Sequence, residues 1–208
     1  MKADPSVSPR PRGRPRAFDA QQALQQVMAT FWRLGYAGTS VDDLSAATGL
    51  SKPSLYGAWG DKQTLYRQAL SAYVAQVGAG LQAAMAAEQS LSDAFGLVLQ
   101  QALALYAQGR GCFLVVTAPT AACEDEAVRT LMAQALAHQD GLFASRFERA
   151  HAQGEWGGDV SPQVAAGWVS ACLHSLALRA RAGVPEQELA EWGQQSLRAL
   201  LSVGMKPL

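Results

Sequence analysis

Apolar residues recur at steps of three and four along almost the whole chain. In the first such stretch, Leu24, Val27, Phe31 and Leu34 fall on one face of a helix, and Gly35 ends it. The alternation of Val, Ile and Thr that is typical of strands is almost absent. The pattern predicts an all-α protein of about nine helices.

Two short helices are expected next, with a glycine-containing turn between them. Thr39 or Ser40 can cap the first of these helices, Ser51 can cap the second, and Gly49 lies in the turn. Asp61 then caps a long helix that leads into the rest of the chain. Two short helices in this order behind a longer bracing helix have the spacing of a helix-turn-helix.

The later part of the chain keeps the helical pattern. Further helices are expected over residues 91–108, 112–123, 124–153, 162–181 and 186–203. The division expected along the chain is a flexible basic arm over residues 1–17, a helix-turn-helix DNA-binding domain over 18–64 and a helical domain over 65–208.

The formal net charge is zero, but the charges are unevenly distributed. Residues 1–67 contain nine Lys and Arg against five Asp and Glu, whereas residues 68–208 contain eight against twelve. Because phosphate contacts need local positive charge whatever the total, the asymmetry indicates that the front of the chain contacts a polyanion.

The basic arm contains candidate DNA contacts in Arg12, Arg14 and Arg16. Residues 11–16 resemble the core of an AT-hook, in which an extended Arg-Gly-Arg-Pro lies in a narrow minor groove. An unstructured arm that touches only phosphates explains the same residues, and the sequence leaves both interpretations open.

Residues 39–65 resemble the DNA-binding module of the TetR family of transcriptional regulators; they read TSVDDLSAATGLSKPSLYGAWGDKQTL. The resemblance extends over about residues 13–70. It implies a homodimer, usually a repressor, in which residues 65–208 form the effector-binding and dimerisation domain. A small-molecule effector would release a palindromic operator by changing the spacing of the two DNA-binding modules.

Specific DNA contacts follow from the resemblance, position by position. It implies contacts in or beside the major groove from Lys52, Pro53, Ser54 and Tyr56, and contacts to phosphates from Thr39, Ser40 and Lys62. A lysine at the start of a recognition helix can reach a phosphate or a guanine, and free N–H groups at helix starts attract anions. The chain departs from many members at Gly57-Ala58, where a bulky pair is common.

Two other functions remain open at this stage. A helical enzyme or small-molecule carrier could use its helix-turn-helix for protein contacts, although no catalytic motif supports an enzyme. An activator differs from a repressor only in the position of its operator. Salt-sensitive operator binding distinguishes a regulator from the enzyme or carrier.

Candidate effector contacts are inward-facing residues of successive helices in the larger domain. They are Phe95, Leu99, Leu103, Phe113, Val116, Met132, His138, Leu142 and Trp168. A mostly apolar pocket favours a hydrophobic or aromatic effector. Periodicity does not distinguish residues that line a pocket from ordinary core, and His138 is either a polar point in the pocket or a surface residue.

The helix expected over residues 162–181 carries two apolar stripes and must be covered on two sides. One stripe is Val164-Trp168-Ala171-Ser175-Leu178, and the other is Ala165-Val169-Cys172-Leu176. Because an uncovered apolar face promotes association, a second subunit is expected on this helix and the last one. The interface residues expected are Val169, Cys172, Leu176, Trp192, Leu197 and Leu201.

The three cysteines form no CxxC pair, so neither a disulfide framework nor a metal site is expected. Cys112 follows Gly111 at a possible helix start, where the helix dipole lowers a thiol pKa and would permit sensing of oxidants or electrophiles. A buried structural cysteine is the alternative. No cofactor is expected, and no segment reaches the ~18 uninterrupted apolar residues of a membrane span, so a cytoplasmic protein is expected.

Overall fold

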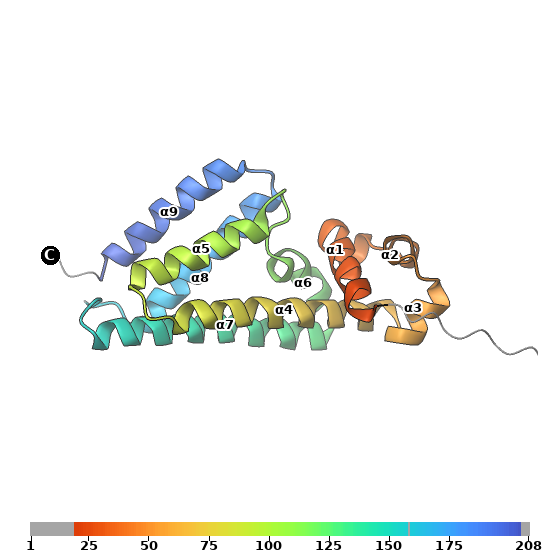
Figure 1. Ribbon diagram of the computed structural model, residues 1–208, viewed down its shortest axis with the longest axis horizontal. Coiled ribbons are helices and arrows are strands. Elements are labelled where there is room, and N and C mark those ends of the chain that lie inside the picture. Colours follow the sequence, from red (N-terminus) through yellow and green to blue (C-terminus); the bar gives the residue numbers. More distant parts are fainter. Residues whose placement is uncertain (1–18, 158, 205–208) are drawn as a thin grey trace, which may run out of the picture.

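The computed structural model describes residues 19–157 and 159–204, and within them it contains nine α-helices and no strand (Figure 1). The all-α prediction is therefore confirmed. The expected basic arm with Arg12, Arg14 and Arg16 lies outside the described residues.

The first three helices form the helix-turn-helix unit, and the second and third begin at caps that the sequence indicates. α1 (Ala20–Gly38) begins after Asp19, and its regular part is interrupted at Gly35, whose φ is +74°. α2 (Val41–Thr48) begins after Ser40, and α3 (Lys52–Trp59) begins after Ser51. The turn between α2 and α3 passes through Gly49 in the left-handed region, at a φ of +67°, where glycine is favoured.

The other six helices form an elongated bundle. They are α4 (Lys62–Ala86), α5 (Leu91–Tyr106), α6 (Phe113–Ala122), α7 (Glu126–Ala152), α8 (Pro162–Arg181) and α9 (Glu186–Ser202). α4 and α7 run side by side along the molecule, α8 packs against α7 and α9, α5 packs against α4, α8 and α9, and α6 lies next to α1 (Figure 1). The helix-turn-helix unit is thus attached at one end of the bundle.

Buried apolar residues form two clusters. The head core joins α1, α2, α3, the first half of α4, α6 and the start of α7. At its centre the Phe31 and Tyr66 rings lie 5.1 Å apart and the Tyr66 and Phe113 rings 5.9 Å apart, both edge to face. Because Leu65 to Tyr73 pack in the head core, the expected domain boundary at residue 64 falls at the start of a helix whose first turns still support the helix-turn-helix.

The body core joins α5, α7, α8, α9 and the end of α4. At one end of it the guanidinium of Arg146 is buried, and its Nη2 donates to the Gln89 carbonyl at 2.7 Å and to Glu155 Oε2 at 3.3 Å. The same carboxylate oxygen accepts the Leu91 N–H at 3.2 Å. These bonds join the turn between α4 and α5 to the segment that follows α7.

Candidate nucleic-acid interface and internal cavity

α3 presents one buried and one exposed side. Leu55 and Trp59 face the head core with 1% and 8% of their surface exposed. The residues expected in the major groove are all exposed: Lys52, Pro53, Ser54 and Tyr56. Residues four apart on a helix share a face, so burial of Leu55 and Trp59 fixes the helix and leaves the other side free for a ligand.

Lys52 is paired with an acidic residue of α2. Its Nζ lies 2.7 Å from Asp42 Oδ1, and both side chains are exposed. The hydrogen bond to Asp42 raises the pKa of Lys52, so the ammonium remains charged. A phosphate or a guanine that binds Lys52 has to compete with this carboxylate.

The two hydroxyl residues before α2 differ in their environment. Thr39 is only 1% exposed, and its hydroxyl donates to the Gly35 carbonyl at 2.6 Å. The hydroxyl of Thr39 therefore faces the interior, and a phosphate contact from this residue stays a prediction. Ser40 is exposed and forms a capping box with Asp43, whose carboxylate accepts from the Ser40 backbone N–H at 2.8 Å.

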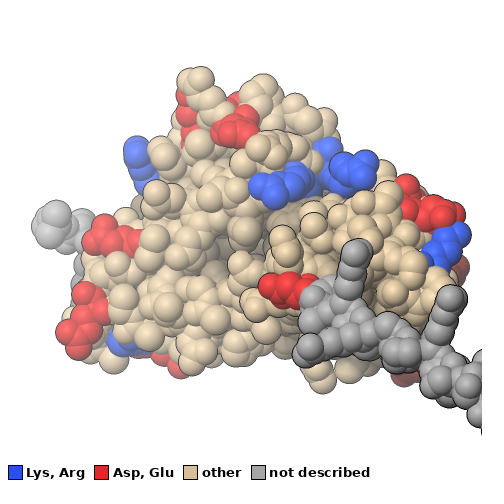
Figure 2. Space-filling view, turned by 45° about the vertical axis from the view of Figure 1, so that its right-hand side comes forward, with Lys and Arg blue, Asp and Glu red and all other residues tan. Residues whose placement is uncertain are grey.

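Lys62 lies at the start of α4, with its Nζ 4.6 Å from the centre of the Tyr36 ring. In residues 19–67 the four cations Arg33, Lys52, Lys62 and Arg67 are matched by four carboxylates. Acidic and basic side chains are interspersed on the face shown in Figure 2, most of which is uncharged. The positive excess of the front of the chain thus lies in residues 1–18.

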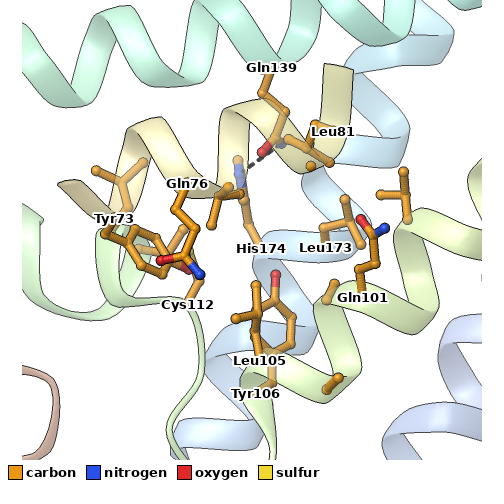
Figure 3. A pocket seen from close by; sticks show the side chains of 17 residues that line it. Tyr73, Gln76, Leu81, Gln101, Leu105, Tyr106, Cys112, Gln139, Leu173 and His174 are labelled. Carbon is orange, nitrogen blue, oxygen red and sulfur yellow. Dashed lines mark hydrogen bonds between the residues drawn. The ribbon is translucent and has the colours of Figure 1, made fainter. Parts of the chain in front are cut away.

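A cavity of about 390 Å³ lies between the head core and the body core (Figure 3). Its walls come from α4, α5, α8, the start of α6 and one residue of α7. The apolar part of the lining includes Val77, Leu81, Val98, Leu105, Leu114 and Leu173. The polar part consists of Tyr73, Gln76, Gln101, Tyr106, Cys112, Gln139 and His174.

The ionisable groups of this lining are held in their neutral forms. Burial is the main cause that lowers the pKa of His174, with Asp140 opposing it. Burial also raises the pKa of Tyr73 and of Tyr106 well above the ordinary value. The Tyr73 hydroxyl donates to Cys112 Sγ at 3.2 Å, and Gln139 Nε2 lies 3.4 Å from His174 Nε2.

None of the nine expected effector contacts lines this cavity. Phe95 and Phe113 are core residues, exposed by 1% and 0%, and Leu99 and Leu103 line a separate groove between α5 and α9. His138 lines a small adjoining pocket. The remaining four are Val116, Met132 and Leu142, which pack against the two cores, and Trp168, which is exposed on α8.

An apolar face of α8 and α9 is exposed. Trp168 and Trp192 are exposed by 39% and 37% and border a groove with Cys172, while the guanidinium of Arg179 lies 4.9 Å from the centre of the Trp192 ring. Val164 and Leu178 extend the same face of α8, exposed by 47% and 53%.

Three of the six expected interface residues lie in the interior of the subunit and not on the exposed face of α8 and α9. Val169, Leu176 and Leu201 are 3% exposed or less and pack inside the subunit, so the outer stripe of α8 is the one that begins at Val164 and Trp168. Leu197 is half-buried and packs against the body core. Cys172 and Trp192 remain on the open face.

Cys112 is the N-cap residue of α6 and lines the cavity. Burial raises its thiol pKa, although hydrogen bonds from Tyr73 and from backbone N–H groups act in the opposite direction. Desolvation therefore outweighs the helix start, which was expected to lower this pKa. A sensing role for Cys112 stays a prediction.

Two further observations concern the described residues alone. Residues 19–157 and 159–204 contain no group of three or more His, Cys, Asp and Glu side chains placed to hold a metal ion. No helix in this part of the chain is long and apolar enough to cross a bilayer.

A helix-turn-helix unit with an exposed recognition helix, joined to a helical domain with a cavity, defines a DNA-binding transcriptional regulator. Residues 24–69 match the family model "Bacterial regulatory proteins, tetR family". A solved structure of the TetR family regulator CifR, a cysteine mutant in complex with 26-bp double-strand operator DNA, is 33% identical. The likeness covers 90% of this chain and 99% of that one, with a TM-score of 0.81. The chain belongs to the TetR family of transcriptional regulators.

Two curated relatives from Escherichia coli K12 are similar over most of their length. The transcriptional repressor ComR is 26% identical over 192 residues, which cover 90% of this chain and 91% of ComR. The transcriptional repressor BdcR is 24% identical over 191 residues, which cover 92% of this chain and 93% of BdcR. These relatives are regulators, so they give no support to the enzyme or carrier alternative.

Proposed function

We propose that the protein is a repressor that binds a palindromic operator as a homodimer and releases it when a small molecule enters the cavity. The observation that carries the proposal is the position of α6. This helix begins at the cavity with Cys112 and continues into the head core with Phe113. One short helix thus touches both the effector site and the support of the DNA-binding unit.

Contacts around α6 give the route by which a ligand would act. The Trp32 indole N–H of α1 donates to the Arg110 carbonyl at 3.0 Å, just before α6, and the Trp32 ring lies 5.6 Å from that of Phe113. Arg181 at the end of α8 donates to the Arg33 carbonyl at 3.0 Å. A ligand that moves the start of α6 would therefore move α1, and it would release DNA only if it prefers the geometry that does not fit the operator.

The exposed face of α8 and α9 supports a homodimer. Two tryptophans and two aliphatic side chains on one face are costly to leave in water. A second copy of the chain related by a two-fold axis would cover the same face on both subunits and would present two α3 helices to the two half-sites of a palindrome. ComR and BdcR are repressors, and CifR was solved with operator DNA, which supports the repressor form of the proposal.

Fluorescence anisotropy with DNA from upstream of the gene, over a salt series, tests the proposal. Tight binding that weakens steeply with salt is expected. Lys52→Ala with Tyr56→Phe should abolish discrimination from random DNA, and removal of residues 1–17 should weaken binding to all DNA and reduce the salt slope, because phosphate contacts of the arm are lost. Ala133→Glu, at an exposed position on α7, is the control variant.

Two results would contradict the repressor proposal. If the folded dimer showed no preference for upstream DNA, and selection from the whole genome also returned no site, the repressor proposal would be wrong. Binding to a site at which the protein raises transcription in a reporter assay would replace repressor by activator.

A further inference from the structure

The cavity contains a hydrogen-bond donor, the Tyr106 hydroxyl, that has no partner among residues 19–157 and 159–204. Building on the proposed function of the cavity, we propose that the effector is an uncharged, mostly apolar organic molecule that carries an oxygen acceptor, such as a ketone, an ester or a lactone. The hydroxyl of Tyr106 donates the hydrogen bond that orients this acceptor.

The charge of the ligand follows from the lining. Among the described residues that line the cavity there is no Asp, Glu, Lys or Arg, and their one imidazole, that of His174, is held neutral by burial. A carboxylate or an ammonium that entered would lose its hydration without a charged side chain in the lining to pair with, which is a heavy free-energy cost. An uncharged molecule avoids this cost and gains from contact with the leucine and valine walls.

The acceptor follows from Tyr106, at the end of α5. The residue is only 6% exposed, and Figure 3 shows its hydroxyl directed toward the middle of the cavity. Among the described residues no hydrogen bond involves this hydroxyl, in contrast to that of Tyr73, which donates to Cys112. Because burial keeps the Tyr106 phenol protonated, it is a donor that an oxygen of the ligand would satisfy.

The other polar groups set the orientation of the ligand. The side chains of Gln76 and Gln101 belong to exposed residues of α4 and α5, whereas Tyr106 and Leu173 are buried. Gln139 is already engaged, since its Nε2 donates to Ser170 Oγ at 3.1 Å. The acceptor of the ligand therefore points inward to Tyr106, and any second polar group points to the two glutamines at the open side.

Matched probes on benzene, naphthalene and cyclohexane frames test the proposal. On each frame a methyl ketone, an ethyl group, a carboxylate and a methylammonium are compared by calorimetric titration of the full-length protein. The ketones are expected to bind more tightly than the other three classes. Tyr106→Phe should weaken ketone binding about fivefold and leave binding of the ethyl compounds unchanged. Tyr36→Phe, which removes a hydroxyl outside the cavity, is the matched control.

Several results would overturn the proposal. Ketone affinities that are equal in the wild type and in Tyr106→Phe would do so, as would carboxylates or ammonium compounds that bind at least as tightly, or a complete lack of ketone binding. Release of operator DNA is measured separately. Ketones that bind through Tyr106 but leave the operator bound would disprove the release mechanism and keep the ligand class, so the two failures are distinguishable.

Discussion

Thr39 and Ser40 are adjacent residues with hydroxyl side chains, of which the first is buried and the second is exposed. The buried Thr39 hydroxyl donates to the Gly35 carbonyl at the kink, and the exposed Ser40 hydroxyl caps α2. We expect Thr39→Val to lower the free energy of unfolding by about 1 kcal/mol, because one buried hydrogen bond is lost, and to change operator affinity less than twofold. Urea denaturation and anisotropy measure the two effects. A variant of normal stability with weakened operator binding would instead show that the Thr39 hydroxyl contacts a phosphate.

The same pair shows what sequence can predict at this scale. A helix cap depends only on nearby residues. The caps at Ser51 and Asp61 were predictable because each side chain accepts a hydrogen bond from a backbone N–H of the helix that follows it. Whether Thr39 faces a phosphate or the interior depends on the path of the chain after Gly35, at a φ of +74°. Periodicity contains no information on that path.

At the scale of elements, the buried guanidinium of Arg146 joins the turn between α4 and α5 to the segment after α7. Its Nε and Nη1 have no partner among the described residues. Glu155→Gln should lower the free energy of unfolding by about 2 kcal/mol, because the buried cation loses its carboxylate. Arg146→Met should cost less, about 1 kcal/mol, because the cation leaves together with its unpaired donors.

Urea denaturation of the two variants measures the difference, with the exposed Glu148→Gln as the control. A larger loss in Arg146→Met than in Glu155→Gln would show that the bond to the Gln89 carbonyl matters more than the charge pair.

α8 shows the limit of sequence at the scale of elements. Its bounds, Pro162–Arg181, agree with the predicted 162–181 because Ser161 caps it and proline suits its first turn. Its two stripes are both apolar, so the pattern does not indicate which one faces the body core. Val169 and Leu176 are buried and Trp168 is exposed, and only the arrangement of α7, α8 and α9 decides this.

At the scale of the whole molecule, the exposed tryptophans make assembly testable. Trp168→Glu places a charge in the face proposed to bind the second subunit, and burial of an unpaired carboxylate is costly. We expect this variant to sediment as a monomer in analytical ultracentrifugation and to lose high-affinity operator binding. Ala133→Glu should keep both properties. A Trp168→Glu variant that remains dimeric would place the interface on another face.

The cavity belongs to the same scale, which is why its lining was not predicted. It lies where the head core and the body core meet, with Tyr73 and Leu114 from one and Tyr106 and Leu173 from the other. Each of these residues occupies an ordinary inward-facing helical position. These positions line a cavity only because the two core clusters leave a gap between them.

The head core also bears on how regulators of this architecture are recombined. Phe113, Ala118 and Ala121 of α6 are buried among the side chains of α1 and α4, although about fifty residues of chain separate the start of α6 from the start of α4. In a chimera that exchanges only the N-terminal segment, the transplanted DNA-binding unit would pack against the α6 of the recipient protein and not against its own. The exchangeable module is therefore discontinuous: it consists of the N-terminal helices together with α6, and a sensor built by swapping should carry both.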